Sequence, residues 1–191
     1  MEICLVRHGE TDWNKEGRLQ GRTNIPLNQA GVDQANECAN HLSTTNYDLI
    51  ITSPLLRAKQ TAEIISEKMS VPILEMNHFI ERNYGDAEGL TVVERTSKFP
   101  NRNYPNQEPR DSLTKRVMEA LHFIYQSEKD KRIILVSHGG VINAILAAIS
   151  NNEIGSGKTK LGNACLSEIK FEKDKWTIQY YNQTSHLSMM R

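Results

Sequence analysis

The chain has 191 residues, in which 23 lysines and arginines are balanced by 23 aspartates and glutamates. A chain of this length can bury a sizeable core without disulfides, a metal or an obligate partner, so we expect one domain over residues 1–191. The balanced charge provides no net field towards nucleic acid or a membrane surface, and we expect neither as a partner.

The cysteines and the N-terminus both bear on the cellular compartment. Cys4, Cys38 and Cys165 are widely spaced and fit neither a disulfide framework nor a C-x-x-C metal or redox motif. The N-terminus carries Glu2 and only four consecutive apolar residues before Arg7, which excludes a signal peptide. No stretch approaches the length of a membrane span. We therefore expect a cytoplasmic protein.

Short apolar runs alternate along the chain with segments of helical period, a pattern typical of βαβ units and a largely parallel sheet. We predict strands at residues 3–6, 48–52, 133–137, 166–171 and 178–181, with a hairpin turn at Asp174 and Lys175. We predict helices at residues 28–42, 54–69 and 112–125, and a fourth helix after Gly140. The pattern therefore predicts an α/β fold.

Two polar segments interrupt this alternation. Residues 89–110 contain three prolines and predict an irregular surface excursion, which we expect to border the mouth of a ligand site. Residues 151–160 contain two glycines and predict a second loop. The sequence shows no heptad pattern and no long apolar stripe, which is consistent with a monomer or a small homo-oligomer.

Two histidines directly follow predicted strands, where open α/β sheets bind ligands. His8 is followed by Gly9, and His138 is followed by Gly139, so both imidazoles have room for a ligand beside them. A histidine in this position is more often a packed structural residue, but two histidines in matching glycine contexts favour a shared functional site. A neutral imidazole is a competent nucleophile, and nearby arginines would keep it unprotonated.

A third strand end carries features of an anion site. Ser53 is a good N-cap and Pro54 suits a first helical turn, so we predict a helix start here, which attracts phosphate. Arg57 then lies in the first turn, where the helix dipole favours an acidic residue. Its guanidinium matches phosphate oxygens, although an isolated helical arginine is usually a solvated surface charge.

Several motifs follow one another along the chain: Arg7-His8-Gly9-Glu10-Thr11, Trp13-Asn14, Gly17-Arg18-Leu19-Gln20-Gly21, Ser53 to Arg57, Glu81 with Gly85, and Ser137-His138-Gly139-Gly140. Together they resemble the signature of the histidine phosphatase (phosphoglycerate mutase-like) superfamily. The resemblance spans nearly the whole catalytic framework of that family. It implies a three-layer α/β sandwich with a mostly parallel central sheet flanked by helices.

The same resemblance implies roles for individual residues. His8 would be the nucleophile that becomes phosphohistidine, while Arg7, Arg57 and His138 would bind the phosphoryl oxygens and stabilise charge during transfer. The remaining positions implied in substrate or phosphate binding, or in shaping the pocket, are Thr11, Asn14, Gln20, Gly21 and Gly139. Asn14 would supply an uncharged amide donor, and its alternative role is that of a surface turn residue.

Glu81 matches the branch of the family that takes its proton donor from this loop. The acid would protonate the leaving alkoxide and then activate water, a role that typically contributes about 10²–10⁴-fold in rate. An ordinary ion pair with Arg82 is the structural alternative. The acid phosphatase branch carries a His-Asp pair instead, whereas His138 is followed here by Gly139. The chain therefore resembles the mutase-like branch.

Within that branch, the chain resembles a hydrolase more than a mutase. Phosphoglycerate mutases carry a long insertion between the loop glutamate and the second histidine, whereas 56 residues (82 to 137) separate these positions here. We predict a phosphatase acting on a small phosphorylated metabolite. A phosphoglycerate mutase remains the first alternative, and a catalytically inactive phospho-ligand binding protein is the second.

We predict that catalysis requires neither a metal nor a cofactor. The other histidines share no H-x-x-x-H spacing and none pairs with a nearby cysteine, so no zinc site is indicated. The chain also lacks a P-loop sequence and a G-x-G-x-x-G turn, which would hold a nucleotide or a dinucleotide. A covalent histidine mechanism needs none of these.

Overall fold

The computed structural model describes residues 1–188, so the last three residues of the expected domain lie outside the described residues. In chain order the helices and strands are β1 (Glu2–Arg7), α1 (Asp12–Lys15), α2 (Gln29–Leu42), β2 (Leu49–Thr52), α3 (Leu56–Met69), β3 (Ile73–Glu75), η1 (Asn77–Phe79), η2 (Gly85–Ala87), α4 (Val92–Lys98), α5 (Arg110–Glu128), β4 (Arg132–Ser137), α6 (Gly139–Ile149), β5 (Leu166–Glu172) and β6 (Lys175–Gln183). Within residues 1–188, no helix combines the length and apolarity needed to cross a membrane.

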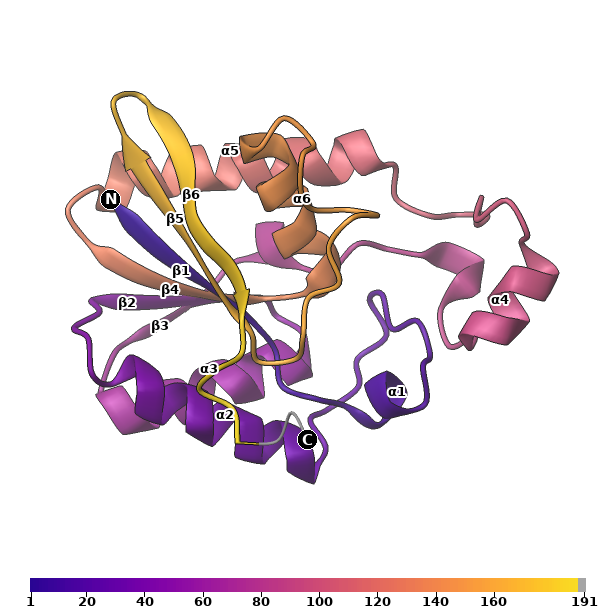
Figure 1. Ribbon diagram of the computed structural model, residues 1–191, viewed down its shortest axis with the longest axis horizontal. Helices are drawn as coiled ribbons and strands as arrows, with labels where there is room; N and C mark the ends of the chain where they lie inside the picture. Colours follow the sequence, from indigo (N-terminus) through magenta and orange to yellow (C-terminus); the bar gives the residue numbers. More distant parts are fainter. Residues whose placement is uncertain (189–191) are drawn as a thin grey trace.

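Six strands form one sheet in the order β3-β2-β4-β1-β5-β6. The pairs β3·β2, β2·β4 and β4·β1 are parallel, while β5 runs antiparallel to both of its neighbours, β1 and β6. Helices α2 and α3 cover one face of the sheet, and α5 and α6 cover the other (Figure 1). This arrangement confirms the predicted three-layer α/β sandwich with a mostly parallel sheet.

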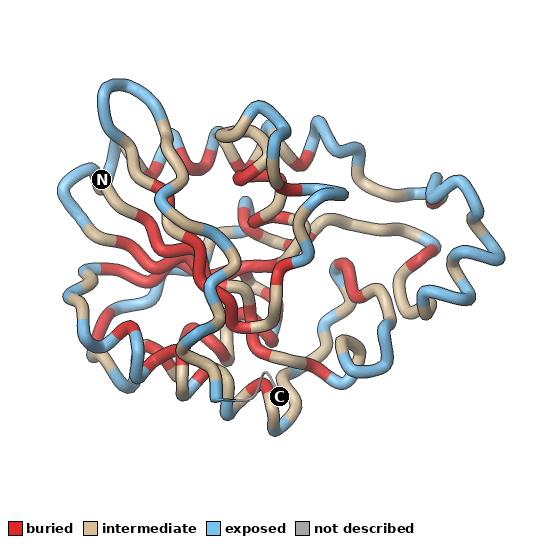
Figure 2. Tube along the Cα trace, viewed as in Figure 1, coloured by how far each residue is buried: buried red, intermediate tan, exposed pale blue. Residues whose placement is uncertain are grey.

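The core divides into two apolar clusters, one on each face of the sheet. In β1, Ile3 and Leu5 belong to the cluster under α5 and α6, whereas Cys4 and Val6 belong to the cluster under α2 and α3. Side chains alternate between the faces of a strand, so a strand covered on both sides needs a continuous apolar run. The buried segments accordingly follow the central strands (Figure 2).

Five short elements were not expected from the sequence: α1, β3, η1, η2 and α4. Strand β3 is a three-residue edge strand whose residues are all exposed, and its apolar run, Ile73 and Leu74, is too short to predict a strand. Helices α1 and α4 are held by capping boxes, in which Thr11 pairs with Asn14 and Thr91 pairs with Glu94. Helix α4 lies inside the segment 89–110, so the prediction that this whole segment is irregular was wrong.

Several predicted boundaries also differ from the structure. The largest differences are at β6, which spans Lys175–Gln183 where residues 178–181 were predicted, and at α5, which spans Arg110–Glu128 where residues 112–125 were predicted. Helix α3 begins at Leu56 with Leu55 as its N-cap, so Ser53 is not the cap and Pro54 precedes the helix. The Ser53 hydroxyl instead bonds His138, on the neighbouring strand end. The β5–β6 turn is centred on Lys173 and Asp174 rather than one residue later, because both have the positive φ (50° and 59°) that a two-residue hairpin turn requires.

Candidate active site

The predicted site residues meet at the carboxyl ends of three neighbouring strands. His8 follows β1, His138 follows β4 and Ser53 follows β2, with β4 lying between the other two strands. Arg7 and Ser137 are register partners, so the two histidines leave adjacent strands at the same level. Their ring centroids are 5.3 Å apart. The structure therefore brings both imidazoles together, as the strand ends had indicated.

The backbone beyond β1 is packed tightly against the start of α2, which fixes where His8 lies. A Cβ atom on Gly9 would collide with the carbonyl group of Gly31, and a Cβ atom on Gly31 would collide with the backbone of Glu10. The Glu10 carboxylate accepts a hydrogen bond from the Asn28 side chain at 2.9 Å, consistent with a structural role for this residue. The two glycines thus permit a close crossing that holds the nucleophile candidate in place.

His8 is held as a neutral ring with one free nitrogen. Its side chain is buried, and Nδ1 lies 2.7 Å from the Gly9 carbonyl oxygen, which can only accept a hydrogen bond. Nδ1 therefore carries the proton, and Nε2 keeps its lone pair. Burial lowers the pKa of His8 well below 6.5, and the positive charges of Arg57 and Arg7 lower it further. The ring lines the cavity described below.

Because the native state disfavours a charged His8, the stability of the folded protein should fall as the pH drops below about 6.5. Below that pH the unfolded chain protonates this ring and the native protein does not, so unfolding becomes easier by about 1.4 kcal/mol per pH unit. Urea unfolding measures the free energy of unfolding at about pH 7.5 and at about pH 5.5. Between these two pH values, this free energy should fall by about 1.4 kcal/mol more in wild type than in His8→Asn. The same pH dependence in both proteins would contradict a neutral native His8.

Two arginines stand beside His8 without a carboxylate partner among residues 1–188: Arg57, which is buried, and Arg7, which is half-buried. Arg57 donates to the carbonyl oxygens of Thr23 (2.9 Å) and Gly21 (2.7 Å), and Arg7 donates to that of Leu161 (2.5 Å). The Nε atom of each arginine is buried and has no partner within the described chain. Burial lowers the pKa of both, that of Arg57 to about 10. Two cations that are wholly or partly withdrawn from water and are paired only with carbonyl dipoles call for an anionic ligand.

His138 completes this group from β4. It is fully buried, and its Nε2 lies 2.6 Å from the Ser53 hydroxyl oxygen, while Nδ1 has no partner among residues 1–188. Burial lowers the pKa of His138 well below its usual value, with Arg57 and His8 as further causes. Gly139 lines the cavity, and a Cβ atom there would lie 3.6 Å from Nε of Arg7. The glycine therefore leaves the space beside Arg7 open.

The Glu81 carboxylate faces the same cavity and is fixed by two backbone amides. Its Oε1 accepts from the Arg82 amide at 2.7 Å, and its Oε2 accepts from the Gly140 amide at 3.0 Å. A Cβ atom on Gly140 would collide with the carboxylate, so this glycine makes room for the acid. The Arg82 guanidinium turns away to the Glu108 carbonyl (2.8 Å) and the Gln107 side chain (3.2 Å). Among residues 1–188 it forms no ion pair with Glu81.

A charged frame behind Glu81 was not expected from the sequence. The carbonyl oxygen of Glu81 accepts from Arg22 (3.2 Å) and Arg116 (3.3 Å). Both arginines also bind the Glu108 carboxylate, Arg116 through two hydrogen bonds of 2.7 and 3.0 Å and Arg22 at 3.4 Å. The Glu108 amide donates to the Asn83 carbonyl at 2.8 Å. Glu108 thus joins the two arginines that hold the backbone of the candidate acid.

A second contact between loops shapes the pocket next to Arg57. Glu88 accepts from the backbone amides of Arg22, Thr23 and Tyr84 at 3.0 to 3.1 Å, which ties two loops together. Gly21 lies against Glu88 with a φ of +52°, a conformation that favours glycine. Gln20 and Gly21 both line the cavity.

Asn14 and Thr11 occupy different places relative to the cavity. Asn14 lines it, and its Oδ1 accepts from Asn163 (3.1 Å) and from the Thr11 hydroxyl (3.1 Å), so its amide donor is left for a ligand. Thr11 is completely buried and caps α1 with its hydroxyl, behind the cavity wall. Thr11 therefore shapes the site through α1 and Asn14 and does not line the cavity.

The cavity has a volume of about 810 Å³, within the size range of small-molecule sites. His8, Arg7, Arg57 and Glu81 line it together with residues of the segments 89–110 and 151–160. Residues 89–110 therefore border the cavity, which is where we expected this segment to lie. Within the described part of the chain, no group of three or more His, Cys, Asp or Glu residues is placed to hold a metal ion.

Comparison with known proteins points to one family. The family model described as "Histidine phosphatase superfamily (branch 1)" matches residues 3–184. The chain is 49% identical over 186 residues to a Bacillus subtilis protein called "Uncharacterized phosphatase PhoE", with 97% of this chain and 96% of that protein covered. It is 36% identical to a metal-independent phosphoserine phosphatase of Arabidopsis thaliana, with 98% of this chain and 83% of that protein covered.

Solved structures give the same result. A mycobacterial glucosyl-3-phosphoglycerate phosphatase, solved in complex with VO3, superposes with a TM-score of 0.88 at 26% identity. The superposition covers 96% of this chain and 99% of that one. The likeness therefore extends over the sheet, both helical layers and the loops around the cavity.

Proposed function

The chain belongs to the histidine phosphatase superfamily and is a phosphoric monoester hydrolase, and we propose that it works through a phosphohistidine formed on His8. The observation that carries this proposal is a neutral, buried imidazole beside two arginines, one buried and one half-buried, that lack carboxylate partners in the described chain. A phosphate dianion would supply the missing negative charge and place its phosphorus atom beside Nε2.

In the first step, the Nε2 lone pair of His8 attacks phosphorus and the bond between phosphorus and the ester oxygen breaks. Arg7, Arg57 and His138 hold the phosphoryl oxygens, with the Asn14 amide as a further donor, and stabilise the charge that develops on them. Glu81 in its acid form gives its proton to the leaving oxygen, so the alcohol departs without forming an alkoxide. The products of this step are the free alcohol, phosphohistidine and the Glu81 carboxylate.

In the second step, a water molecule replaces the alcohol. The Glu81 carboxylate takes a proton from this water as its oxygen attacks phosphorus, and the bond between phosphorus and Nε2 breaks. His8 returns to its neutral form and inorganic phosphate leaves. Gln20, Gly21 and Gly139 shape the space for the phosphoryl group, and Thr11 supports Asn14 from behind.

The substrate we propose is a small phosphorylated metabolite. Two of the similar proteins are named for such compounds, phosphoserine in one case and glucosyl-3-phosphoglycerate in the other. A cavity of about 810 Å³ has room for an organic group beyond the phosphate.

The decisive experiment incubates the purified protein, without added metal, with a set of phosphomonoesters that includes 3-phosphoglycerate. Inorganic phosphate and 2-phosphoglycerate are measured in the same samples. We expect release of phosphate and no 2-phosphoglycerate. Isomerisation without phosphate release would replace the proposal with a mutase, and the absence of both would favour a protein that only binds phosphorylated ligands.

A further inference from the structure

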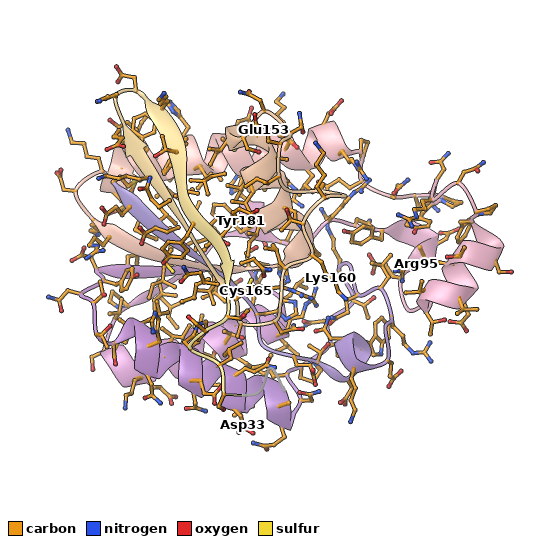
Figure 3. All side chains as sticks on the ribbon, in the orientation of Figure 1. Asp33, Arg95, Glu153, Lys160, Cys165 and Tyr181 are labelled. Atoms are coloured by element: carbon orange, nitrogen blue, oxygen red, sulfur yellow. The ribbon has the colours of Figure 1, made fainter. Side chains whose placement is uncertain are left out.

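The segment 161–165, between α6 and β5, packs against the backbone of the nucleophile candidate. Cys165, its last residue, is labelled in Figure 3, and its carbonyl oxygen accepts from the Arg7 amide at 3.2 Å. The Ala164 amide donates to the His8 carbonyl oxygen, also at 3.2 Å. The proposed reaction uses no side chain of this segment, so the purpose of these contacts is open to inference.

Asn163 carries the one side-chain amide of this segment, and its NH2 group lies among three oxygen atoms. Its Nδ2 is 3.1 Å from Oδ1 of Asn14, 3.2 Å from the His8 carbonyl oxygen and 3.3 Å from the Gly9 carbonyl oxygen. Backbone carbonyls can only accept hydrogen bonds, so the atom that faces them must be the nitrogen of this amide. The surroundings therefore settle which way the Asn163 amide points.

This orientation in turn bears on Asn14. Because Asn163 presents a donor, Asn14 must present its oxygen to it. The Thr11 amide and hydroxyl donate to the same oxygen at 3.2 and 3.1 Å. Asn14 lines the cavity, and its NH2 group is thereby left for a phosphoryl oxygen. Asn163 is half-buried and is not one of the described residues that line the cavity, so any effect on the reaction passes through its neighbours.

The NH2 group of Asn163 separates oxygen atoms that would otherwise repel one another. Without this donor, three oxygens with partial negative charge would face one another across the same space. Asn14 belongs to α1, whereas His8 and Gly9 follow β1, so repulsion would move the two segments apart. Asn163 thus holds the donor of one segment in a fixed relation to the nucleophile of the other.

The backbone beside Asn163 is held in an unfavourable conformation. Ala164 is completely buried and has a φ of +51°, in the left-handed region that residues other than glycine rarely adopt. Such a conformation persists where surrounding contacts over-determine it. The Gly162 amide donates to Oδ1 of Asn182 at 2.8 Å, and the Ala164 carbonyl oxygen lies 3.0 Å from Nε2 of His186. These contacts keep Asn163 at its place beside the nucleophile.

We propose that Asn163 is a positioning residue for phosphoryl transfer. Its NH2 group fixes Asn14 relative to His8, so that the Asn14 donor meets a phosphoryl oxygen as Nε2 of His8 attacks phosphorus. This inference rests on the proposed function, because it assigns an orienting role within the same reaction. No motif of the sequence indicated Asn163, which lies 149 positions from Asn14 in the chain.

The first test measures phosphoryl transfer and ligand binding separately in Asn163→Ala. The single-turnover rate with nitrophenyl phosphate should fall by about tenfold or more, because a misplacement of about 1 Å can cost about 10²-fold. Vanadate, which resembles the five-coordinate transition state, should inhibit the variant about tenfold less strongly. The affinity for inorganic phosphate in calorimetry should change by less than about threefold, because Arg7 and Arg57 remain.

Two further variants separate the donor from the shape and the charge of the side chain. Asn163→Asp keeps the size of the side chain but presents only acceptors, so it should lose at least as much transfer rate as Asn163→Ala. Asn182→Asp is the matched control, because it adds the same charge to the same region and keeps the acceptor for the Gly162 amide. It should keep the wild-type transfer rate within about twofold.

A double-mutant cycle shows whether Asn163 acts through Asn14. In an Asn14→Ala background, Asn163→Ala should lower the single-turnover rate by less than about threefold, because the donor that it positions is already absent. Equal losses in both backgrounds would mean that Asn163 does not act through Asn14, which would overturn the inference.

The remaining outcomes that would overturn the inference can be told apart. A wild-type rate in Asn163→Asp would mean that the side chain only fills space. Equal losses of phosphate affinity and transfer rate in Asn163→Ala would mean that the pocket as a whole has loosened. No phosphate release from any ester by wild type would overturn the proposed function together with this inference.

Discussion

His8→Ala should abolish phosphate release, with a fall in kcat on the order of 10⁶-fold, as expected when a covalent nucleophile is removed. The reason lies in the arrangement of the two histidines. His8 keeps a free Nε2, whereas Nε2 of His138 is engaged by the Ser53 hydroxyl at 2.6 Å, so His138 cannot simply replace it. Phosphate release from a phosphomonoester, followed under saturating substrate, measures the effect.

Two further measurements separate a lost nucleophile from a lost fold. Wild type quenched in alkali during turnover of a radiolabelled ester should retain protein-bound phosphate, and His8→Ala should retain none. Because Arg7 and Arg57 remain, His8→Ala should still bind inorganic phosphate in calorimetry. His122→Ala, on the exposed side of α5, should keep wild-type activity. Full turnover by His8→Ala would move the nucleophile elsewhere.

Glu81→Gln should cause the second large loss of phosphatase activity, and the size of this loss should depend on the leaving group of the ester. Esters of simple alcohols need a proton on the departing oxygen, so their transfer to His8 should slow by about 10²–10⁴-fold. The nitrophenolate of a nitrophenyl ester leaves without a proton, so transfer of the phosphoryl group from this ester to His8 should remain fast. Hydrolysis of the phosphohistidine still needs Glu81 as a base and should become the slow step.

Stopped-flow measurement distinguishes these steps. With a nitrophenyl ester, Glu81→Gln should release a burst of about one nitrophenolate per active site, followed by slow turnover. With an alkyl ester the same variant should show no burst. Glu63→Gln, on the exposed side of α3, serves as the matched control and should behave as wild type. A uniform slowing of both ester classes without a burst would exclude Glu81 as the proton donor.

The parts of the fold that could be predicted are those with a two-sided or a helical apolar pattern. Strands β1, β2 and β4 are buried on both faces and read as continuous apolar runs, so their positions were predicted to within one residue. Strand β3 has no such signal, because it is a three-residue exposed edge strand that pairs with β2 alone within the sheet. The capping box of Thr91 and Glu94 was a visible signal for α4, and it was overlooked.

In the site, sequence reasoning found the residues in recognisable motifs and missed those that support them. Glu108 and Arg22 are 86 positions apart in the chain, so nothing local indicates that their side chains meet. Ser53 was assigned to a helix end because the sequence does not show that β2 lies next to β4. Contacts of this kind depend on how the loops close over the sheet, and only the folded chain reveals them.

The loop that contains α4 lies outside the contacts that hold Glu81 and the other reacting groups. The segment that contains α4 is tied at its start, where Gly89 donates to the Leu19 carbonyl at 2.8 Å, and beyond its end, where Asp86 donates to the Pro105 carbonyl at 3.0 Å. Between these ties α4 lies at the end of the molecule farthest from the β5–β6 turn (Figure 1). Residues 92–103 line the cavity through Arg95 and Arg102, and we expect that exchanging them changes which ester is accepted while the reacting groups keep their geometry.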